Sequence, residues 1–229
     1  MKKTTLILAL ILIAIVIYVA RRPDPTPSSF TLPKPTPQTT ADPAQQSEAT
    51  TGNFDYYLLN LSWSPEFCQT HATSRECAQH LGFVLHGLWP QNTNGAYPES
   101  CSTAPGPQNP AAFSDIYPDP GLLRHEWQIH GTCSGLSPDA FFTLARNAFH
   151  NVTIPPALSQ LNQEISLTPK QLLTQFQAAN PSFPAASLAL SCGNNRLTAV
   201  EVCMNKSAQP IPCGPIRSCR ANTIHITPP

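Results

Sequence analysis

The sequence has few charged residues, and its cysteines lack the spacing of a zinc site. Only 11% of the 229 residues are Asp, Glu, Lys or Arg, and the basic and acidic residues number 13 each. No two of the eight cysteines have the C-x-x-C spacing that zinc modules use. The sequence shows no internal repeat either. These absences argue against a structural zinc site and against a surface that is basic at every pH.

The N-terminal segment is expected to direct the chain to a membrane. Residues 1–22 begin with two lysines, continue with a long apolar run to Ala20 and end on two arginines. The run lies between the usual length of a signal-peptide core and the roughly 17 residues of a minimal membrane span, so a signal peptide and an anchor both remain open. A cut after Ala20 would place Tyr18 where signal peptidase prefers a small residue, which favours an uncleaved anchor over residues 4–20.

Residues 23–52 are expected to form a Pro-rich disordered linker. They are rich in Pro, Thr, Ser and Gln, and they contain no aromatic residue after Phe30. A Pro-rich peptide ligand is the alternative, but the prolines alternate with small polar residues as they do in spacers. Residues 53–229 are then one exported domain, periplasmic or extracellular, that contacts a membrane only through the N-terminal segment.

The cysteines predict that the exported domain is held by disulfides. All eight follow the linker, and an even number of cysteines behind an export signal indicates disulfide bonds. Four bridges are expected, but roughly a hundred pairings are possible and the residues alone do not choose among them. The cysteines are Cys68, Cys77, Cys101, Cys133, Cys192, Cys203, Cys213 and Cys219.

The histidines predict a charge that depends on pH. All seven follow residue 53, where 8 basic residues are outnumbered by 10 acidic ones. The net charge of this region moves from −2 toward +5 if every histidine is protonated. Attraction for a polyanion is therefore expected only in acid.

Short apolar strands and capped helices alternate in the exported domain. Strands are expected near residues 54–61, 82–88, 188–191, 197–204 and 223–227. Helices are expected over residues 120–130, 137–150 and 168–180, each opening at a proline or a Ser/Thr-Pro pair. The connections are long and Pro-rich, so an α+β domain stapled by disulfides is expected rather than a doubly wound sheet.

Two histidine-containing segments carry the candidate chemistry. Residues 83–90 read Phe-Val-Leu-His-Gly-Leu-Trp-Pro, and residues 125–133 read His-Glu-Trp-Gln-Ile-His-Gly-Thr-Cys. The second is not a zinc-protease helix, because His125 and His130 are five apart and diverge by about 140° around a helix axis. Glu126 and His130 are four apart, so the carboxylate is expected to orient the imidazole and raise its basicity.

Three histidines and a glutamate suit the cleavage of RNA through its own 2′-hydroxyl. That reaction needs a base, an acid and stabilisation of negative charge on phosphorus, and it gives a cyclic 2′,3′-phosphate. DNA lacks the 2′-hydroxyl and cannot react. We therefore expect an endoribonuclease that acts on single-stranded RNA without a metal or another cofactor. An exported metallohydrolase that uses the same histidines is the competing enzyme class.

Both segments resemble the two active-site segments of the ribonuclease T2 family, the secreted acid ribonucleases of transferase type. The cysteine spacing and the Ala-Tyr-Pro-Glu-Ser-Cys stretch at residues 96–101 are also similar, so the resemblance runs from about residue 54 to the C-terminus. It implies that His86 is the general acid and His130 the general base. It further implies that His125 binds phosphate and that Glu126 stabilises the pentacovalent intermediate.

The resemblance also implies base-binding residues, a fold and a disulfide pattern. Trp89 and Tyr97 resemble the aromatics that sandwich a base, and Gln91 lies where some members place a base-recognising side chain. The implied fold is α+β, with a central antiparallel sheet and helices packed around it. The implied bridges are Cys68–Cys77, Cys101–Cys133, Cys192–Cys219 and Cys203–Cys213.

One position departs from the family pattern. Members commonly have a lysine immediately before the second catalytic histidine, whereas this chain has Ile129. Isoleucine offers no charge or donor to the phosphorane, so a slower enzyme is expected. Arg124 is not expected to substitute, because it points about 140° away from position 129 on a helix. The alternative is a catalytically weakened RNA-binding or regulatory protein, but retention of all four motif residues favours the enzyme.

The other histidines match no motif and are expected to be structural or exposed. They are His71, His80, His150 and His225.

The protein is expected to be a monomer.

Overall fold

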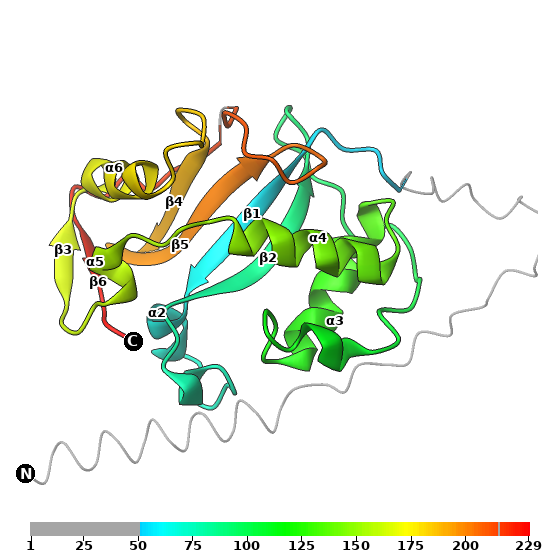
Figure 1. Cartoon of the computed structure of the whole chain (residues 1–229), viewed down its shortest axis with the longest axis horizontal. Helices are drawn as coiled ribbons and strands as arrows, with labels where there is room; N and C mark the ends of the chain where they lie inside the picture. The colour runs from blue at the N-terminus through cyan, green and yellow to red at the C-terminus, as the bar shows by residue number, and fades with distance from the viewer. Residues whose placement is uncertain (1–50, 215) are drawn as a thin grey trace, which may run out of the picture. The chain divides into compact units, whose positions relative to one another are not determined.

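The computed structural model describes residues 51–214 and 216–229, and the predictions for residues 1–22 and nearly all of 23–52 lie outside this part of the chain. The fold is α+β, as predicted, and is built on a six-stranded sheet with the order β2-β1-β5-β6-β3, in which β4 also pairs with β5 (Figure 1). The strands are β1 (Tyr56–Trp63), β2 (Phe83–Gln91), β3 (Ile165–Leu167), β4 (Leu188–Gly193), β5 (Arg196–Met204) and β6 (Ile224–Ile226). All pairings are antiparallel except the short contact between β5 and β6.

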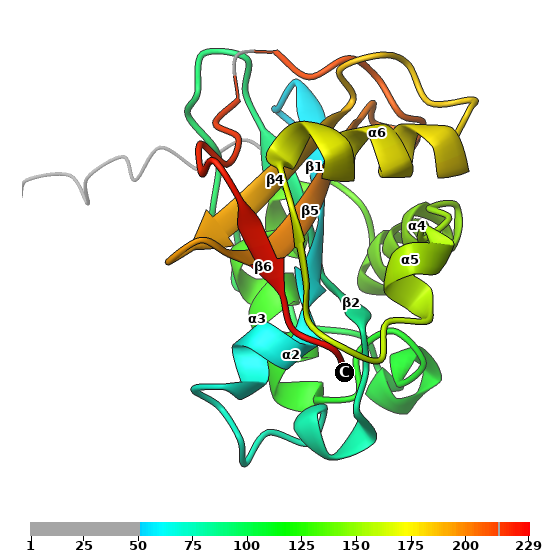
Figure 2. The same ribbon diagram turned by 90° about the vertical axis from the view of Figure 1, so that its left-hand side faces the viewer.

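Strand β1 lies between β2 and β5, and its residues face the core and the opposite side of the sheet in turn. Tyr57, Leu59 and Leu61 alternate along it and are each 1% exposed or less. Burying a leucine completely contributes about 1.5–3 kcal/mol, so this alternation fixes which face is covered. Figure 2 shows the covering helices α4 (Pro138–His150), α5 (Pro156–Ser159) and α6 (Pro169–Ala179) on one side of the sheet. The residues between the buried ones, such as Leu58, face the other side.

The predicted helices begin where their caps were expected. The Ser137 side chain accepts a hydrogen bond from the backbone of Ala140 at the start of α4, and Thr168 and Gln171 form a capping box at the start of α6. Asp119 caps α3 (Pro120–Ile129) in the same way. Two short helices and the three-residue strand β3 were not predicted. The helices are α2 (Ser64–Cys68) and α5, and single-turn 3-10 helices cover Cys77–Gln79, Pro110–Phe113 and Gly131–Cys133.

Four disulfides join parts of the described chain, and they are the four pairs that the family resemblance implies. The bond Cys101–Cys133 connects the segment after β2 to the residues after α3. Beside it, the backbone N–H of Ser100 donates to the carbonyl of Ile129 at 2.8 Å. The remaining bonds are Cys68–Cys77, Cys192–Cys219 and Cys203–Cys213.

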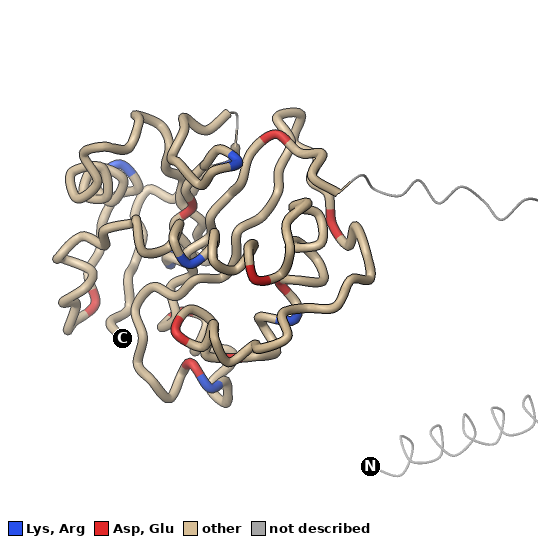
Figure 3. Tube along the Cα trace, turned by 45° about the vertical axis from the view of Figure 1, so that its right-hand side comes forward, with Lys and Arg blue, Asp and Glu red and all other residues tan. Residues whose placement is uncertain are grey.

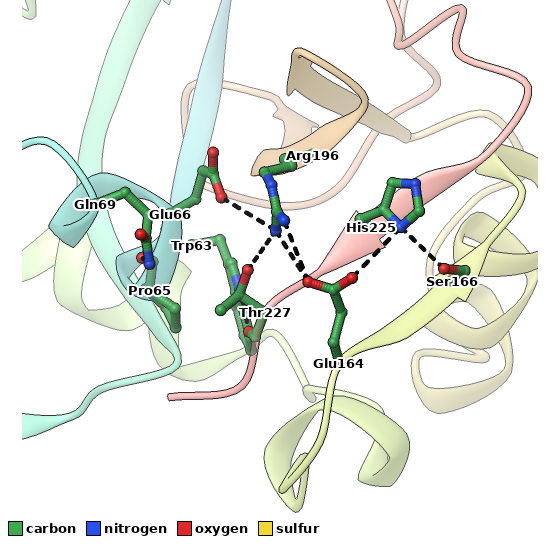
Figure 4. A network of polar contacts seen from close by, with 9 residues as sticks. All are labelled: Trp63, Pro65, Glu66, Gln69, Glu164, Ser166, Arg196, His225 and Thr227. Carbon is green, nitrogen blue, oxygen red and sulfur yellow. Dashed lines mark hydrogen bonds and ion pairs between the residues drawn. The ribbon is translucent and has the colours of Figure 1, made fainter.

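A polar network holds the C-terminal strand to the rest of the sheet (Figure 4). Arg196, at the start of β5, donates to Glu164 at 3.2 Å and to the Thr227 hydroxyl at 2.7 Å. The guanidinium also lies 3.9 Å from Glu66 on α2. His225 Nδ1 on β6 is 3.6 Å from the same Glu164 carboxylate. We call these five residues the Arg196 network.

Charged residues are sparse in the described chain, and Figure 3 shows the lysines and arginines scattered along it rather than gathered in one stripe. This distribution agrees with the low charge of the sequence. In residues 51–214 and 216–229, no helix has the length and apolar character needed to cross a membrane.

Candidate active site

The residues singled out from the sequence gather where β2, an edge strand of the sheet, runs beside α3. Strand β2 supplies three of them, α3 supplies two, and the segments that follow α3 and β2 supply one each. In that order they are His86, Trp89, Gln91, His125, Glu126, His130 and Tyr97.

A cleft of about 540 Å³ opens among these residues and is lined by five of the seven. His86 is not among the residues that line it; its ring centroid lies 5.2 Å from that of Trp89, and 41% of its side chain is exposed. Glu126 is fully buried beside it. Leu58 and Glu99 also line the cleft, although the motifs did not single them out. The alternation along β1 places Leu58 on this face, so that residue could have been found from the sequence.

The carboxylate of Glu126 contacts Trp89 and His86. The indole N–H of Trp89 donates to Glu126 Oε2 at 2.9 Å, and His86 Nε2 lies 3.7 Å from Oε1. Oε1 itself has no hydrogen-bond partner among the described residues. The carboxylate is therefore held at one oxygen, and the other faces the imidazole of His86.

The predicted side-chain contact between Glu126 and His130 was wrong. His130 Nδ1 has no hydrogen-bond partner within the described chain, and the contact between the two residues is from the backbone N–H of His130 to the carbonyl of Glu126, at 3.1 Å. The spacing argument failed because α3 ends at Ile129 and His130 is its C-cap residue, with φ −111° and ψ −48°. The Glu126 carboxylate instead reaches β2.

Gly87 allows the carboxylate to reach that strand. A β-carbon at this position would lie 2.0 Å from Glu126 Oε2 and 2.2 Å from Trp89 Nε1, so any larger residue would occupy the space of their hydrogen bond. The glycine between His86 and Leu88 is thus required by a close approach. It brings the buried glutamate and both histidine-bearing segments together.

Burial controls the proton affinities at this end of the sheet. Burial raises the pKa of Glu126 to about 8, and the hydrogen bond from Trp89 opposes that rise. Burial, with the nearby His125, lowers the pKa of His86. Burial followed by the neighbouring His125 and His86 lowers the pKa of His130 to about 4. His130 is therefore neutral over most of the acidic range, whereas the Glu126 carboxyl keeps its proton there.

No lysine or arginine of the described chain lines the cleft. Ile129 lines it at the position where a lysine was expected from the family pattern. Arg124 does not line this cleft but a neighbouring pocket, together with Trp127, Gln128 and Ile129. Among the described residues that line this cleft, those that can carry a positive charge are therefore histidines.

The aromatic residues leave room for a flat ligand. Trp89 is half-buried, with its ring centroid 5.3 Å from that of His130, and Tyr97 is 56% exposed. Gln91 also lines the cleft. The histidines outside the motifs do not line the cleft: His71 stacks on Phe67 and His225 belongs to the Arg196 network. In the described residues, no group of three or more His, Cys, Asp or Glu side chains is arranged to hold a metal ion.

Comparison with known proteins gives a consistent result. Residues 54–213 match the model of the Ribonuclease T2 family. A ribonuclease of Aeromonas hydrophila is 47% identical over 118 residues, and a probable ribonuclease of Haemophilus influenzae is 31% identical over 179 residues. These matches cover 51% and 69% of this chain but only 54% and 61% of the respective relatives.

The fold is also found among solved structures. The crystal structure of RNase NT in complex with 5′-AMP superposes with a TM-score of 0.60 at 20% identity. It covers 77% of this chain and 99% of its own. At that identity, the superposition supports the fold alone.

Proposed function

The chain belongs to the ribonuclease T2 family, and from this we propose that it is a metal-independent endoribonuclease that cuts single-stranded RNA through a 2′,3′-cyclic phosphate. The observation that carries the proposal is the placement of His86 and His130 against the same tryptophan, with ring centroids 5.2 and 5.3 Å from that of Trp89. An acid and a base thereby flank a tryptophan that lines the cleft. DNA is not cleaved because it lacks the attacking hydroxyl.

His130 is the proposed base. Its lowered pKa keeps the imidazole neutral above about pH 4, so it can accept the proton of the ribose 2′-hydroxyl. As that proton leaves, the 2′-oxygen forms a bond to phosphorus. The absence of a hydrogen-bond partner on Nδ1 in the described chain leaves this ring to be positioned by its packing against Trp89.

The imidazole of His86 is the proposed acid, and Glu126 is the proposed stabiliser of the pentacovalent intermediate. His86 Nε2 lies 3.7 Å from Glu126 Oε1, and the raised pKa of Glu126 keeps that carboxyl protonated to about pH 8. The proton passes from His86 to the 5′-oxygen as its bond to phosphorus breaks.

His125 and the aromatic residues are the proposed substrate-binding groups. His125 is exposed on α3 and lines the cleft, where its side chain can contact the phosphate. Trp89 and Tyr97 offer faces on which a base can stack, and such stacking contributes about 1–3 kcal/mol per base. Gln91 can hydrogen-bond a base edge. Because the cleft has no lysine or arginine among its described lining residues, binding of RNA is expected to strengthen in acid.

The four disulfides are consistent with an exported protein. We propose that the domain works as a monomer in the periplasm or outside the cell, and that residues 1–22 target it there.

Product analysis tests the proposed reaction. The purified, oxidised protein is incubated with RNA at pH 5 and pH 7.5 in the presence of EDTA, and the new ends are analysed. We expect 2′,3′-cyclic phosphates, faster cleavage at pH 5 and no loss of rate with the chelator. Loss of cleavage in EDTA, with recovery on adding a divalent metal, would instead identify a metallohydrolase.

A further inference from the structure

A second pocket adjoins the active-site cleft. It has a volume of about 520 Å³, and Leu58, Gln91 and Tyr97 line both hollows. Its other walls include Glu201 on β5 and Arg217 near the C-terminus. A strand of RNA held on Trp89 can therefore continue past Tyr97 into this second pocket.

Glu201 presents a fixed hydrogen-bond acceptor to the pocket. Its Oε1 accepts from the Asn60 amide at 3.2 Å and from the Ser191 hydroxyl at 3.0 Å. Asn60 is 5% exposed, so these donors belong to the packed sheet rather than to a mobile surface. No donor in the described residues reaches Oε2. That oxygen keeps its capacity for a ligand that fills the pocket.

The proposed cleavage chemistry makes no use of this carboxylate. Burial raises the pKa of Glu201, and the hydrogen bonds from Ser191 and Asn60 oppose the rise. Burying a carboxylate disfavours its charged form, so a glutamate here stabilises the fold less than an apolar residue would. A role other than stability is therefore the better explanation for this glutamate. Its two donors keep the acceptor oriented toward the pocket, as a binding function requires.

We propose that this pocket binds the base of an additional nucleotide, next to the one in the cleft, and that Glu201 makes it prefer guanine. The Watson–Crick edge of guanine has two adjacent N–H donors that can share Oε2, whereas the single N–H of uracil lies between two carbonyls that a carboxylate repels. Tyr56 and Tyr97 provide aromatic surface beside the base. Arg217 is exposed at the rim, where it can pair with a backbone phosphate. The inference rests on the proposed function, since it requires RNA in the cleft.

Binding of oligonucleotides that cannot be cleaved tests the pocket directly. Trideoxynucleotides with a fixed dinucleotide and a third base, guanine, hypoxanthine or uracil, are titrated into the full protein at pH 7 by calorimetry, with the third base at either end. We expect guanine to bind about 10-fold more tightly than uracil at one end, with hypoxanthine, which lacks the amino group, between them. The Glu201→Gln variant should lose this preference. The Asp139→Asn control, which removes a negative charge from the exposed start of α4, should keep it.

Two results would overturn the inference: equal affinities for guanine and uracil at both ends, or the same guanine preference in Glu201→Gln. If that variant folds poorly, the affinities of the unchanged protein for guanine and hypoxanthine still test the inference. Equal values would exclude a contact to the amino group of guanine. Cleavage of the matching ribodinucleotide, which is too short to reach the second pocket, tests the proposed function separately. Guanine preference without that cleavage would reject the proposed nuclease activity and retain the proposed pocket. Cleavage without guanine preference would retain the nuclease activity and reject the pocket.

Discussion

Two regions of the protein use the same residue types in opposite ways. At the active site, Glu126 is fully buried, accepts a single hydrogen bond from Trp89 and faces the imidazole of His86. In the Arg196 network, the Glu164 side chain is 46% exposed, accepts two bonds from Arg196 and faces the imidazole of His225. Each region thus pairs a glutamate with a histidine, but only the network adds an arginine.

The difference shows what burial without a cation achieves. A carboxylate that accepts from a guanidinium in partial contact with water is stabilised as an anion, and its energetic contribution to folding is small. A carboxylate that is buried with one neutral donor keeps its proton instead, as the raised pKa of Glu126 shows. The first arrangement joins neighbouring strands, and the second leaves a neutral carboxylic acid beside His86.

Removing a histidine from each region should give the largest contrast. His130→Ala removes the proposed base and is expected to lower kcat by about 10³-fold, with RNA binding largely retained. His225→Ala removes an exposed network residue and should leave kcat within about 2-fold. The measurement is single-turnover cleavage together with RNA affinity. Comparable losses in both variants would contradict the division of roles.

Filling the space beside Gly87 should separate Glu126 from Trp89. Gly87→Ala places a methyl group where their hydrogen bond lies, and we expect kcat to fall about 10²-fold and the melting temperature to drop by several degrees. The matched control is Gly193→Ala at the end of β4, where a β-carbon meets only Thr198 Cγ2, at 3.6 Å. Unchanged kinetics in Gly87→Ala would show that the buried contact is not needed.

The same Glu→Gln exchange should change stability in opposite directions in the two regions. Folded Glu126 keeps its proton to about pH 8, whereas the unfolded chain releases it near pH 4.5, so unfolding becomes easier as pH rises through this window. Glu126→Gln has no such proton and is expected to gain about 2–4 kcal/mol over the natural protein at pH 8, and almost nothing at pH 4. Urea denaturation at both pH values measures the difference.

Glu164→Gln is the partner of that experiment. It loses exposed ion pairs and is expected to destabilise the fold by about 0.2–1 kcal/mol, less in high salt. A loss of stability in both variants at pH 8 would mean that Glu126 is held as an anion after all.

Adding a cation to the active site is the mildest test of the comparison. Ile129→Lys puts into the cleft the charge that the described lining residues lack, and kcat should rise about 10-fold with a smaller change in KM. Gln128→Lys, on the side of α3 that lines the pocket of Arg124, is the matched control and should not raise kcat. Equal rates for all three proteins would reject the role assigned to position 129.

Local signals in the sequence predicted much of the fold. The caps at Ser137 and Thr168 located the starts of α4 and α6, because a capping side chain acts within three residues of its own position. The strand β3 was missed because its three residues become a strand only by pairing with β6, about 60 positions away in the chain. Short elements that depend on distant partners carry almost no local signal.

The residues of the site were predicted to a similar extent, and the prediction of one contact was wrong for a similar reason. The resemblance identified the residues that gather at the cleft, but the partner of Glu126 was predicted from helix spacing alone. The actual partner depends on Gly87 lying on a neighbouring strand, which is a tertiary contact. Glu201 was not singled out, because its place beside the cleft requires the register in which Asn60 lies opposite it.

The bond between Cys101 and Cys133 also has a consequence for the time at which the protein becomes active. It ties the segment that carries Tyr97 to the residues just after His130, so two walls of the cleft are joined covalently only when the thiols are oxidised. In a reducing cytosol this disulfide does not form. We therefore expect chains whose thiols are still reduced to be poor nucleases, which would protect the RNA of the cell that produces them.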